Sequence, residues 1–191
     1  MSRQEIRITG FGGQGVVLSA HIIGRACAIH ASKHATMIQS FGPEARGSAC
    51  SATLVIEDHE VLYPYVRQPS YLVALSGEGY EKYRRELAPG GTLVHEKELV
   101  QPVTVEGQKL FAVPSTRLAE ELGRSIVQNI VMLGFFTAVS QVTSRDQMRE
   151  AVEGSVPAGT TDLNLRAFEA GAAYYDEVYG GAAQPADPVS V

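Results

Sequence analysis

A short strand pattern that runs directly into a glycine-rich turn, and from there into an amphipathic helix, sets the fold class of this chain. Residues 3–9 alternate so that Ile6 and Ile8 share one face, and the sequence GFGGQG follows at once over residues 10–15. Beyond the turn, apolar residues recur at helical spacing and predict a helix over residues 13–31 that packs on a sheet. Elements in this order open an α/β fold.

The remaining pattern predicts a three-layer α/β/α fold, in which a mostly parallel sheet has helices on both faces and the C-terminal part is helical. Further strands are expected at residues 35–39, 48–57, 60–63, 71–75, 92–95 and 110–113. Helices are expected at residues 79–87, 115–122, 126–141, 144–152 and 163–179, with Ser115 and Ser144 as N-caps. We expect residues 1–179 to form one domain, and the Gly-, Ala- and Pro-rich residues 180–191 to be a flexible tail or an arm on a partner.

One predicted helix differs from the others because it is apolar on nearly all sides. Residues 126–142 carry large apolar side chains on every face, so this helix must be buried all round. It is either central to the domain or shared with another subunit. We favour the shared role, because an obligate interface resembles a domain core cut in half.

Composition and charge narrow the class of protein. The 191 residues are 45% hydrophobic and carry a net charge of −5, which argues against a nucleic-acid-binding surface. The first fifty residues nevertheless carry five basic against two acidic side chains, so an anionic ligand would favour the N-terminal end. The sequence shows neither a basic leader followed by an apolar segment nor an apolar run long enough to span a membrane, so we expect a cytoplasmic protein.

Residues that commonly hold metals or perform proton transfer are sparse. The two cysteines, Cys27 and Cys50, lie 23 residues apart in apolar surroundings, so we expect them to be small buried side chains. The five histidines have no carboxylate or serine at a suggestive spacing. We therefore predict no metal site and no catalytic residue in this chain.

The glycine turn matches the dinucleotide-binding fingerprint in its spacing and in its context between a strand and a helix. That fingerprint also needs an acidic residue about 20 residues later to hold the ribose hydroxyls. Residues 6–43 contain no Asp or Glu, and the second predicted strand ends in Gln39 and Ser40, which argues against an NAD site.

A more general use of the turn remains. Glycines let the backbone approach a ligand closely, and amides at a helix N-terminus attract a phosphate or carboxylate. The alternative is that the glycines only permit a tight turn. The candidate ligand-binding residues are Gly10, Gly12, Gly13, Gln14 and Gly15.

A second cluster, QSFGPEARGS at residues 39–48, combines a stiffening proline, two glycines, opposite charges and an aromatic ring. Loops that leave the carboxyl ends of parallel strands share an edge, so this loop is expected beside the glycine turn. The alternative is a solvated loop with an exposed ion pair. The candidate interface or active-site residues are Phe41, Gly42, Pro43, Glu44, Arg46 and Gly47.

Taken together, the two motifs resemble the gamma subunit, or gamma domain, of the 2-oxoacid:ferredoxin oxidoreductases of the pyruvate, 2-oxoglutarate, ketoisovalerate or aryl 2-oxoacid type. Two later groups of residues also look like that family, and the resemblance covers about residues 4–178. Phe41 and Ser48 stand where such loops commonly have Tyr and Gly, which are mild changes. The later groups are Asn129 with Leu133 and Gly134, and Asn164 with Ala167, Phe168 and Gly171.

The resemblance implies a subunit that cannot turn over alone. Such enzymes convert a 2-oxoacid and coenzyme A (CoA) to acyl-CoA, CO2 and two electrons, which pass through [4Fe-4S] clusters to ferredoxin or another acceptor. Thiamine diphosphate with Mg2+ carries the carbanion chemistry. This chain has no thiamine-type GDG motif and too few cysteines for a cluster, so the resemblance places these cofactors on alpha, beta and ferredoxin-like partner subunits.

Our working hypothesis is that the amides of residues 12–15, with Gln14, help to hold the phosphates or pantetheine of CoA, while residues 41–46 fit against the catalytic subunit. Two alternatives stay open, a stand-alone Rossmann-type nucleotide- or flavin-binding module and a purely structural clamp subunit. The 2-oxoacid, the final acceptor and the stoichiometry are also open at this stage, with 2-oxoglutarate or an aryl 2-oxoacid favoured.

Overall fold

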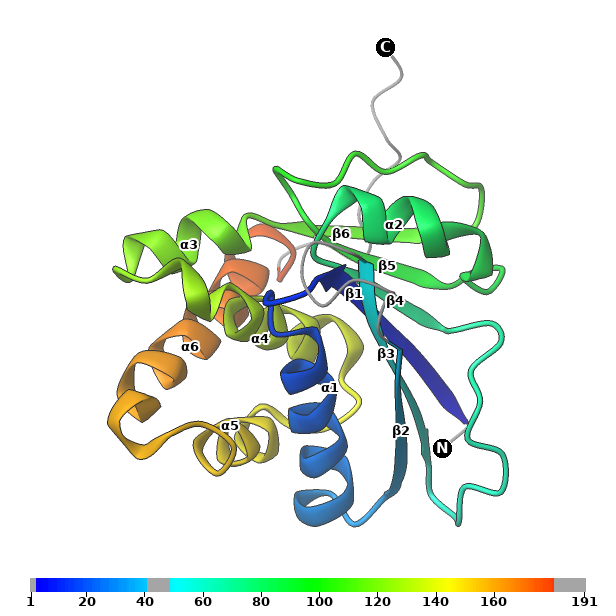
Figure 1. The fold of residues 1–191 in the computed structure, drawn as a ribbon, viewed down its shortest axis with the longest axis horizontal. Helices are drawn as coiled ribbons and strands as arrows, with labels where there is room; N and C mark the ends of the chain where they lie inside the picture. The colour runs from blue at the N-terminus through cyan, green and yellow to red at the C-terminus, as the bar shows by residue number, and fades with distance from the viewer. Residues whose placement is uncertain (1–2, 41–48, 181–191) are drawn as a thin grey trace.

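The structure of the protein, a computed structural model, describes residues 3–40 and 49–180. Within these ranges the chain forms a six-stranded sheet in the order β2-β3-β1-β4-β5-β6 (Figure 1). The strands are β1 (Gln4–Phe11), β2 (His34–Ser40), β3 (Ala49–Glu57), β4 (Tyr71–Ala74), β5 (Thr92–Glu96) and β6 (Lys109–Val113).

The sheet is mostly parallel, as predicted. Strands β1, β4, β5 and β6 pair in parallel, whereas β3 is antiparallel to both β1 and β2. Among the described strands, β3 alone therefore runs against the others. The expected strand at residues 60–63 is wrong, because no strand forms there. The guanidinium of Arg3 instead binds the backbone of this segment, donating to the carbonyl oxygens of Tyr63 at 2.9 Å and Tyr65 at 3.3 Å.

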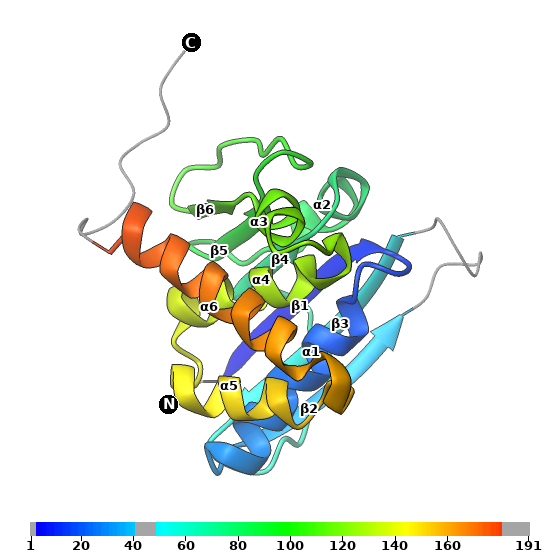
Figure 2. The same ribbon diagram turned by 90° about the vertical axis from the view of Figure 1, so that its left-hand side faces the viewer.

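Helices cover both faces of the sheet, which confirms the three-layer architecture. Figures 1 and 2 show α1, α4, α5 and α6 on one side of the sheet and α2 on the other. The helices are α1 (Val16–Arg25), which continues as a π-helical turn (Ala26–His30), α2 (Gly77–Tyr83), α3 (Ser115–Glu121), α4 (Gln128–Ser140), α5 (Arg145–Glu153) and α6 (Thr161–Val178). Short 3₁₀ turns lie at Arg84–Glu86, Ser125–Val127 and Ala158–Thr160.

Strand β4 shows why two cores form. Side chains alternate across a strand, so Leu72 and Ala74 pack in the cluster under α2, whereas Val73 belongs to the larger cluster under α1 and α4. All three are at most 2% exposed. A continuous apolar run covered on both faces is what a buried parallel strand requires.

Helix α4 is the inner helix of the larger layer. Its residues from Asn129 to Ala138 are all buried within this single chain. The sheet and α6 lie on opposite sides of it (Figure 2), and α6 approaches so closely that a Cβ on Gly134 would collide with the carbonyl oxygen of Phe168. Our preference for a role shared with another subunit is therefore wrong: this chain covers the helix itself.

The predicted N-caps had different outcomes. Ser144 caps α5 through a capping box with Gln147, as predicted. Ser115 is not a cap but the first residue of α3. The backbone N–H of Thr116 instead donates to the carboxylate of Glu96 at 3.4 Å, and that carboxylate is fully buried.

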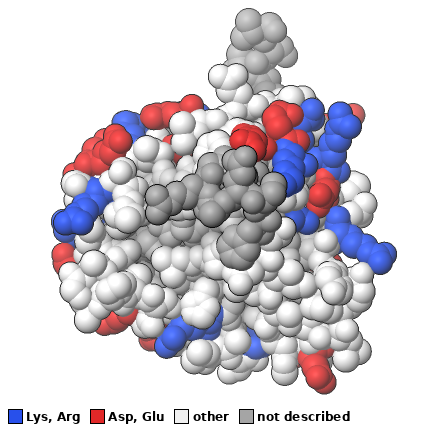
Figure 3. Space-filling model, in the orientation of Figure 1, with Lys and Arg blue, Asp and Glu red and all other residues white. Residues whose placement is uncertain are grey.

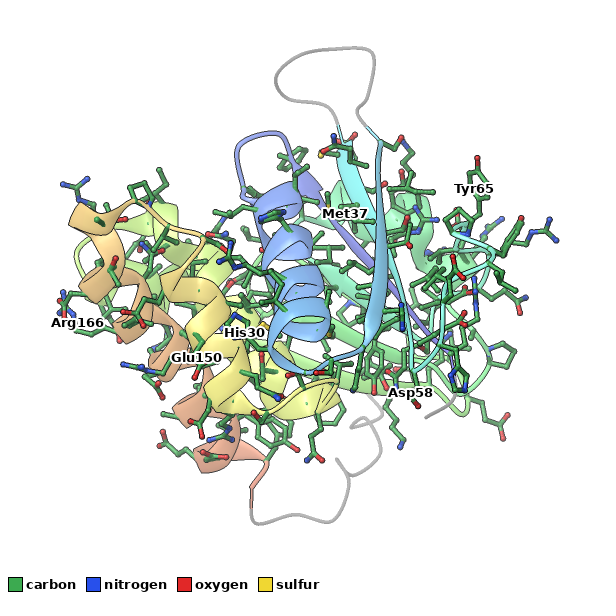
Figure 4. The ribbon with its side chains drawn as sticks, turned by 90° about the horizontal axis from the view of Figure 1, so that it is seen from below. His30, Met37, Asp58, Tyr65, Glu150 and Arg166 are labelled. Atoms are coloured by element: carbon green, nitrogen blue, oxygen red, sulfur yellow. The ribbon has the colours of Figure 1, made fainter. Side chains whose placement is uncertain are left out.

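A side-chain contact joins the π-helical turn that follows α1 to helix α5. His30, in the π-helical turn, lies 2.9 Å from the carboxylate of Glu150 in α5, and the two side chains face each other (Figure 4). Along residues 3–40 and 49–180, no helix combines the length and the hydropathy needed to cross a membrane. Most of the predicted tail, residues 181–191, lies outside the described residues.

We predict that Gly134→Ala lowers the free energy of unfolding by about 2–4 kcal/mol, because the added methyl group forces α4 away from the α6 backbone. The gain in helix propensity, about 1 kcal/mol, is too small to offset this. Urea unfolding monitored by circular dichroism measures the change. Gly159→Ala is the control, since a Cβ there would lie more than 4 Å from every other residue that the structure describes. Equal stability of the two variants would contradict the close packing.

Candidate functional site

The candidate site lies at the carboxyl end of β1. At this position, the helices that follow two neighbouring parallel strands lie on opposite faces of the sheet. Helix α1 follows β1 on one face, and α2 follows the neighbouring parallel strand β4 on the other. Ligands of open α/β sheets bind at such a switch point, because the loops diverge there and leave a crevice. The glycine turn of residues 10–15 occupies this position.

The turn leaves the N-terminus of α1 without a side-chain cap. Gly15 is the N-cap residue with a left-handed backbone (φ 73°), and Gly13 also has a positive φ of 97°. The first turn of α1 contains no acidic residue. The free amides and the positive end of the helix dipole therefore point to an anion rather than to a cation.

Gln14 fixes the shape of the turn. Its Oε1 accepts a hydrogen bond from the Phe11 N–H at 2.7 Å, and its Nε2 donates to the carbonyl oxygen of Leu75 at 3.2 Å. Leu75 directly follows β4, so this one side chain joins the turn to the neighbouring strand across the switch point. A Cβ on Gly10 would approach Gln14 Oε1 to 2.7 Å, so glycine at position 10 makes this arrangement possible.

Asn129, near the start of α4, approaches the turn from the other side. A Cβ at Gly15 would collide with the Asn129 carboxamide, and Nδ2 is the atom it would meet first. Asn129 is 3% exposed, and its Nδ2 has no hydrogen-bond partner among the described residues. The sequence analysis did not predict that Asn129 contacts the turn. It identified Asn129 only as part of the pattern that resembles the family.

The second predicted cluster, Phe41, Gly42, Pro43, Glu44, Arg46 and Gly47, lies outside the described residues. The residues that bracket it can be placed. Ser40 pairs with Ser51, which in turn pairs with Thr9 of β1, and Ala49 pairs with Phe11. Both ends of the segment therefore join the sheet at the edge where the glycine turn begins.

Comparison with known proteins decides the family. The model of the pyruvate ferredoxin/flavodoxin oxidoreductase family matches residues 5–174. The chain belongs to this family. Membership confirms the resemblance that the two motifs indicated.

Several members of this family are similar to the chain over most of its length. The 2-oxoglutarate synthase subunits KorC of Methanothermobacter thermautotrophicus and Methanocaldococcus jannaschii are 43% and 42% identical, and each alignment covers 88% of this chain and 93% or 92% of the relative. The gamma subunit of keto/oxoacid ferredoxin oxidoreductase from Geobacter sulfurreducens has a TM-score of 0.78 at 36% identity, over 88% of this chain and 95% of that one.

A more distant structure extends the comparison of the fold. The 2-oxoglutarate:ferredoxin oxidoreductase from Magnetococcus marinus, solved with 2-oxoglutarate, coenzyme A and succinyl-CoA bound, has a TM-score of 0.84 at 22% identity. That alignment covers 99% of this chain and 34% of the Magnetococcus chain. This fold thus occurs both as a separate subunit and as part of a larger chain.

Two titratable side chains at the end of β5, His95 and Glu96, are engaged by burial and by hydrogen bonds. Burial lowers the pKa of His95 at the end of β5, and its Nδ1 lies 3.0 Å from the carbonyl oxygen of Glu96. Glu96 Oε2 accepts from the backbone N–H groups of Glu98 and Leu99 at 2.6 and 2.7 Å. The buried Glu96 carboxylate is therefore already engaged by backbone donors.

The described residues do not fit an iron–sulfur cluster. They contain no group of three or more His, Cys, Asp or Glu residues that could hold a metal ion. Cys27 and Cys50 are both buried, and burial raises the pKa of Cys27 to about 11 and also raises that of Cys50. A cluster needs about four thiolates, so these residues supply neither the number nor the ionised state.

We predict that Gln14→Ala lowers the free energy of unfolding by about 1–3 kcal/mol, because two hydrogen bonds are lost. Gln14→Glu keeps the acceptor for Phe11 but places a carboxylate oxygen against the Leu75 carbonyl oxygen. Its deficit relative to the parent protein should shrink as the pH falls towards about 4, because a protonated carboxyl can donate again. Urea titrations at several pH values measure this. A pH-independent deficit would show that Nε2 does not hold Leu75.

Proposed function

We propose that this chain is the gamma subunit of a cytoplasmic, CoA-acylating 2-oxoacid:ferredoxin oxidoreductase, which converts a 2-oxoacid and CoA to acyl-CoA, CO2 and two electrons. The observation that carries the proposal is the uncapped N-terminus of α1 at the switch point, in a chain that belongs to this enzyme family. The relatives at 42–44% identity are named as subunits of 2-oxoglutarate synthase, so we favour 2-oxoglutarate as the substrate of the complex.

In this proposal the chain binds and positions CoA. The free backbone amides of Gly15 and the first residues of α1 hold a phosphate group of the coenzyme, and Gln14 keeps the turn in the binding shape. On the face of the molecule seen in Figure 3, charged side chains lie mainly towards the periphery. The first turn of α1 contains no acidic residue, so backbone donors and the helix dipole would hold the anion.

The other cofactors belong to partner subunits in this proposal. Thiamine diphosphate with Mg2+ would supply the carbanion chemistry on the alpha and beta subunits, and [4Fe-4S] clusters on a ferredoxin-like subunit would pass the electrons to ferredoxin or another acceptor. Residues 41–47 would meet the catalytic subunit, because both ends of this segment join the sheet beside the glycine turn.

The two alternatives make different demands on the site. A stand-alone nucleotide- or flavin-binding module needs an acid after β2, but residues 34–40 end in Gln39 and Ser40. A purely structural clamp needs no uncapped helix N-terminus at the switch point. The uncapped α1 therefore favours the CoA-binding role over both.

We predict that a tagged chain co-purifies from its native host with subunits that contain thiamine diphosphate and iron–sulfur clusters. The reason is that the sequence has no GDG motif for thiamine diphosphate, and the described residues include no set of side chains that could hold a cluster. Native mass spectrometry identifies the assembly, and a CoA-dependent decarboxylation assay with 2-oxoglutarate, pyruvate and branched-chain or aryl 2-oxoacids identifies the substrate. Recovery of the chain as a monomer that binds NAD or flavin would favour the alternative module.

We also predict that Gly13→Asp raises the KM for CoA at least about tenfold relative to Gly13→Asn, a difference of about 1.4 kcal/mol, with little change in the KM for the 2-oxoacid. The two side chains have the same shape, and a Cβ at this position has no neighbour among the described residues within 4 Å. The backbone strain of φ 97° is common to both variants, so only the charge differs. Equal KM values for CoA would leave the clamp role as the better explanation.

A further inference from the structure

We propose that Asn129 is a ligand-binding residue of the glycine-turn site, and that its Nδ2 donates a hydrogen bond to a phosphate oxygen of the bound coenzyme. This inference rests on the proposed function, in which CoA binds at the turn. It identifies a side-chain donor that the turn itself lacks, because the carboxamide of Gln14 is already used in holding Phe11 and Leu75.

The first argument is an unpaired donor at a buried position. Asn129 is 3% exposed, and Nδ2 has no hydrogen-bond partner among the described residues. Buried donors are almost always paired, because leaving one unpaired costs the full desolvation of the group. An unpaired buried amide in a well-packed layer therefore points to an acceptor that arrives with another molecule.

The second argument is the direction of the carboxamide. Nδ2 is the Asn129 atom nearest to the place where a side chain on Gly15 would begin, so the donor end of the amide faces the turn. On its inner side, Asn129 borders a small space lined mainly by apolar side chains, including Ile8, Val73 and Met132. Ser19 also lines this space, but its hydroxyl group does not pair with Nδ2, so the side of the turn is where an acceptor can approach.

The third argument is that the neighbouring groups are donors of the same kind. The N-terminus of α1, a helix of 10 residues, has no side-chain cap and no acidic residue in its first turn. An amide N–H beside these backbone N–H groups completes a set of neutral donors around one position. A phosphate oxygen satisfies such a set, because it accepts several hydrogen bonds at once.

A purely structural role would be served better by another residue. Leucine has the same branching and the same number of side-chain heavy atoms as asparagine, and it leaves no donor unpaired in the layer between α1 and α4. The chain contains a suitable comparison in α6, where Asn164 is 7% exposed but its Nδ2 donates to the Thr160 carbonyl oxygen at 2.9 Å. Asn164 thus has the structural role that Asn129 lacks.

The test uses the assembled complex with Asn129→Leu, Asn129→Asp and, as the matched control, Asn164→Leu. The KM is measured for CoA, for 3′-dephospho-CoA, which keeps the pyrophosphate, and for pantetheine, which has no phosphate. We expect both Asn129 variants to raise the KM for CoA and dephospho-CoA at least about tenfold, with pantetheine unaffected. Asn129→Leu should melt at or above the temperature of the parent protein, whereas Asn164→Leu should melt lower with an unchanged KM for CoA.

Several results would overturn the inference. It is overturned if the KM for CoA of the Asn129 variants stays within twofold of the parent value. It is also overturned if the KM for pantetheine rises as much as the KM for CoA, because the donor would then bind another part of the ligand. A lower melting temperature for both Asn129 variants with unchanged KM would assign Asn129 a structural role. If Asn129→Leu does not assemble, the isosteric Asn129→Asp decides alone.

The Gly13 variants separate failure of this inference from failure of the proposed function. If Gly13→Asp and Gly13→Asn also have equal KM values for CoA, the proposed function itself fails. If their KM values differ but the Asn129 variants keep the parent KM, only this inference fails.

Discussion

The close contact between the backbones of α4 and α6 determines where α4 lies relative to the glycine turn, and so which α4 residue reaches the candidate site. Because Gly134 and Gly171 have no side chains, the two helices approach until a Cβ on either would meet a backbone carbonyl oxygen of the other. This contact lets α4 lie between the sheet and α6 as an inner helix, buried by its own chain. The start of α4 then reaches the glycine turn, where Asn129 meets Gly15.

The site that results is made of neutral donors and contains no group suited to proton transfer among the described residues. Its backbone amides, its helix dipole and the Asn129 carboxamide favour an anion without placing a charge in the crevice. Burial lowers the pKa of His95, and the Glu96 carboxylate accepts hydrogen bonds from backbone amides of the neighbouring loop and of α3. This arrangement agrees with the role proposed above, in which the chain binds CoA and partner subunits carry the redox cofactors.

Much of the fold could be predicted because strands and turns leave local patterns. The alternation at Ile6 and Ile8 and the N-cap at Ser144 both hold in the structure. The errors concern contacts between distant residues. Nothing near residues 60–63 shows that Arg3 will bind their backbone, and nothing near Ser115 shows that Glu96 will take the place of its N-cap. Likewise, an all-round apolar helix has the same sequence in a domain core and in an interface, and only the packing of α6 distinguishes the two.

The position of the antiparallel strand β3 explains why an acidic residue at the end of β2 could not serve a dinucleotide-binding site. In a parallel Rossmann sheet, the second strand lies next to the first, and its terminal carboxylate reaches the ribose of the bound nucleotide. Here β3 separates β1 from β2, which moves the end of β2 about 10 Å away from β1, or two strand spacings. A carboxylate at Gln39 or Ser40 would be too far away for that contact. Because β3 lies between β1 and β2, the surface beside the glycine turn does not have to bind a ribose. It can instead contact a neighbouring subunit.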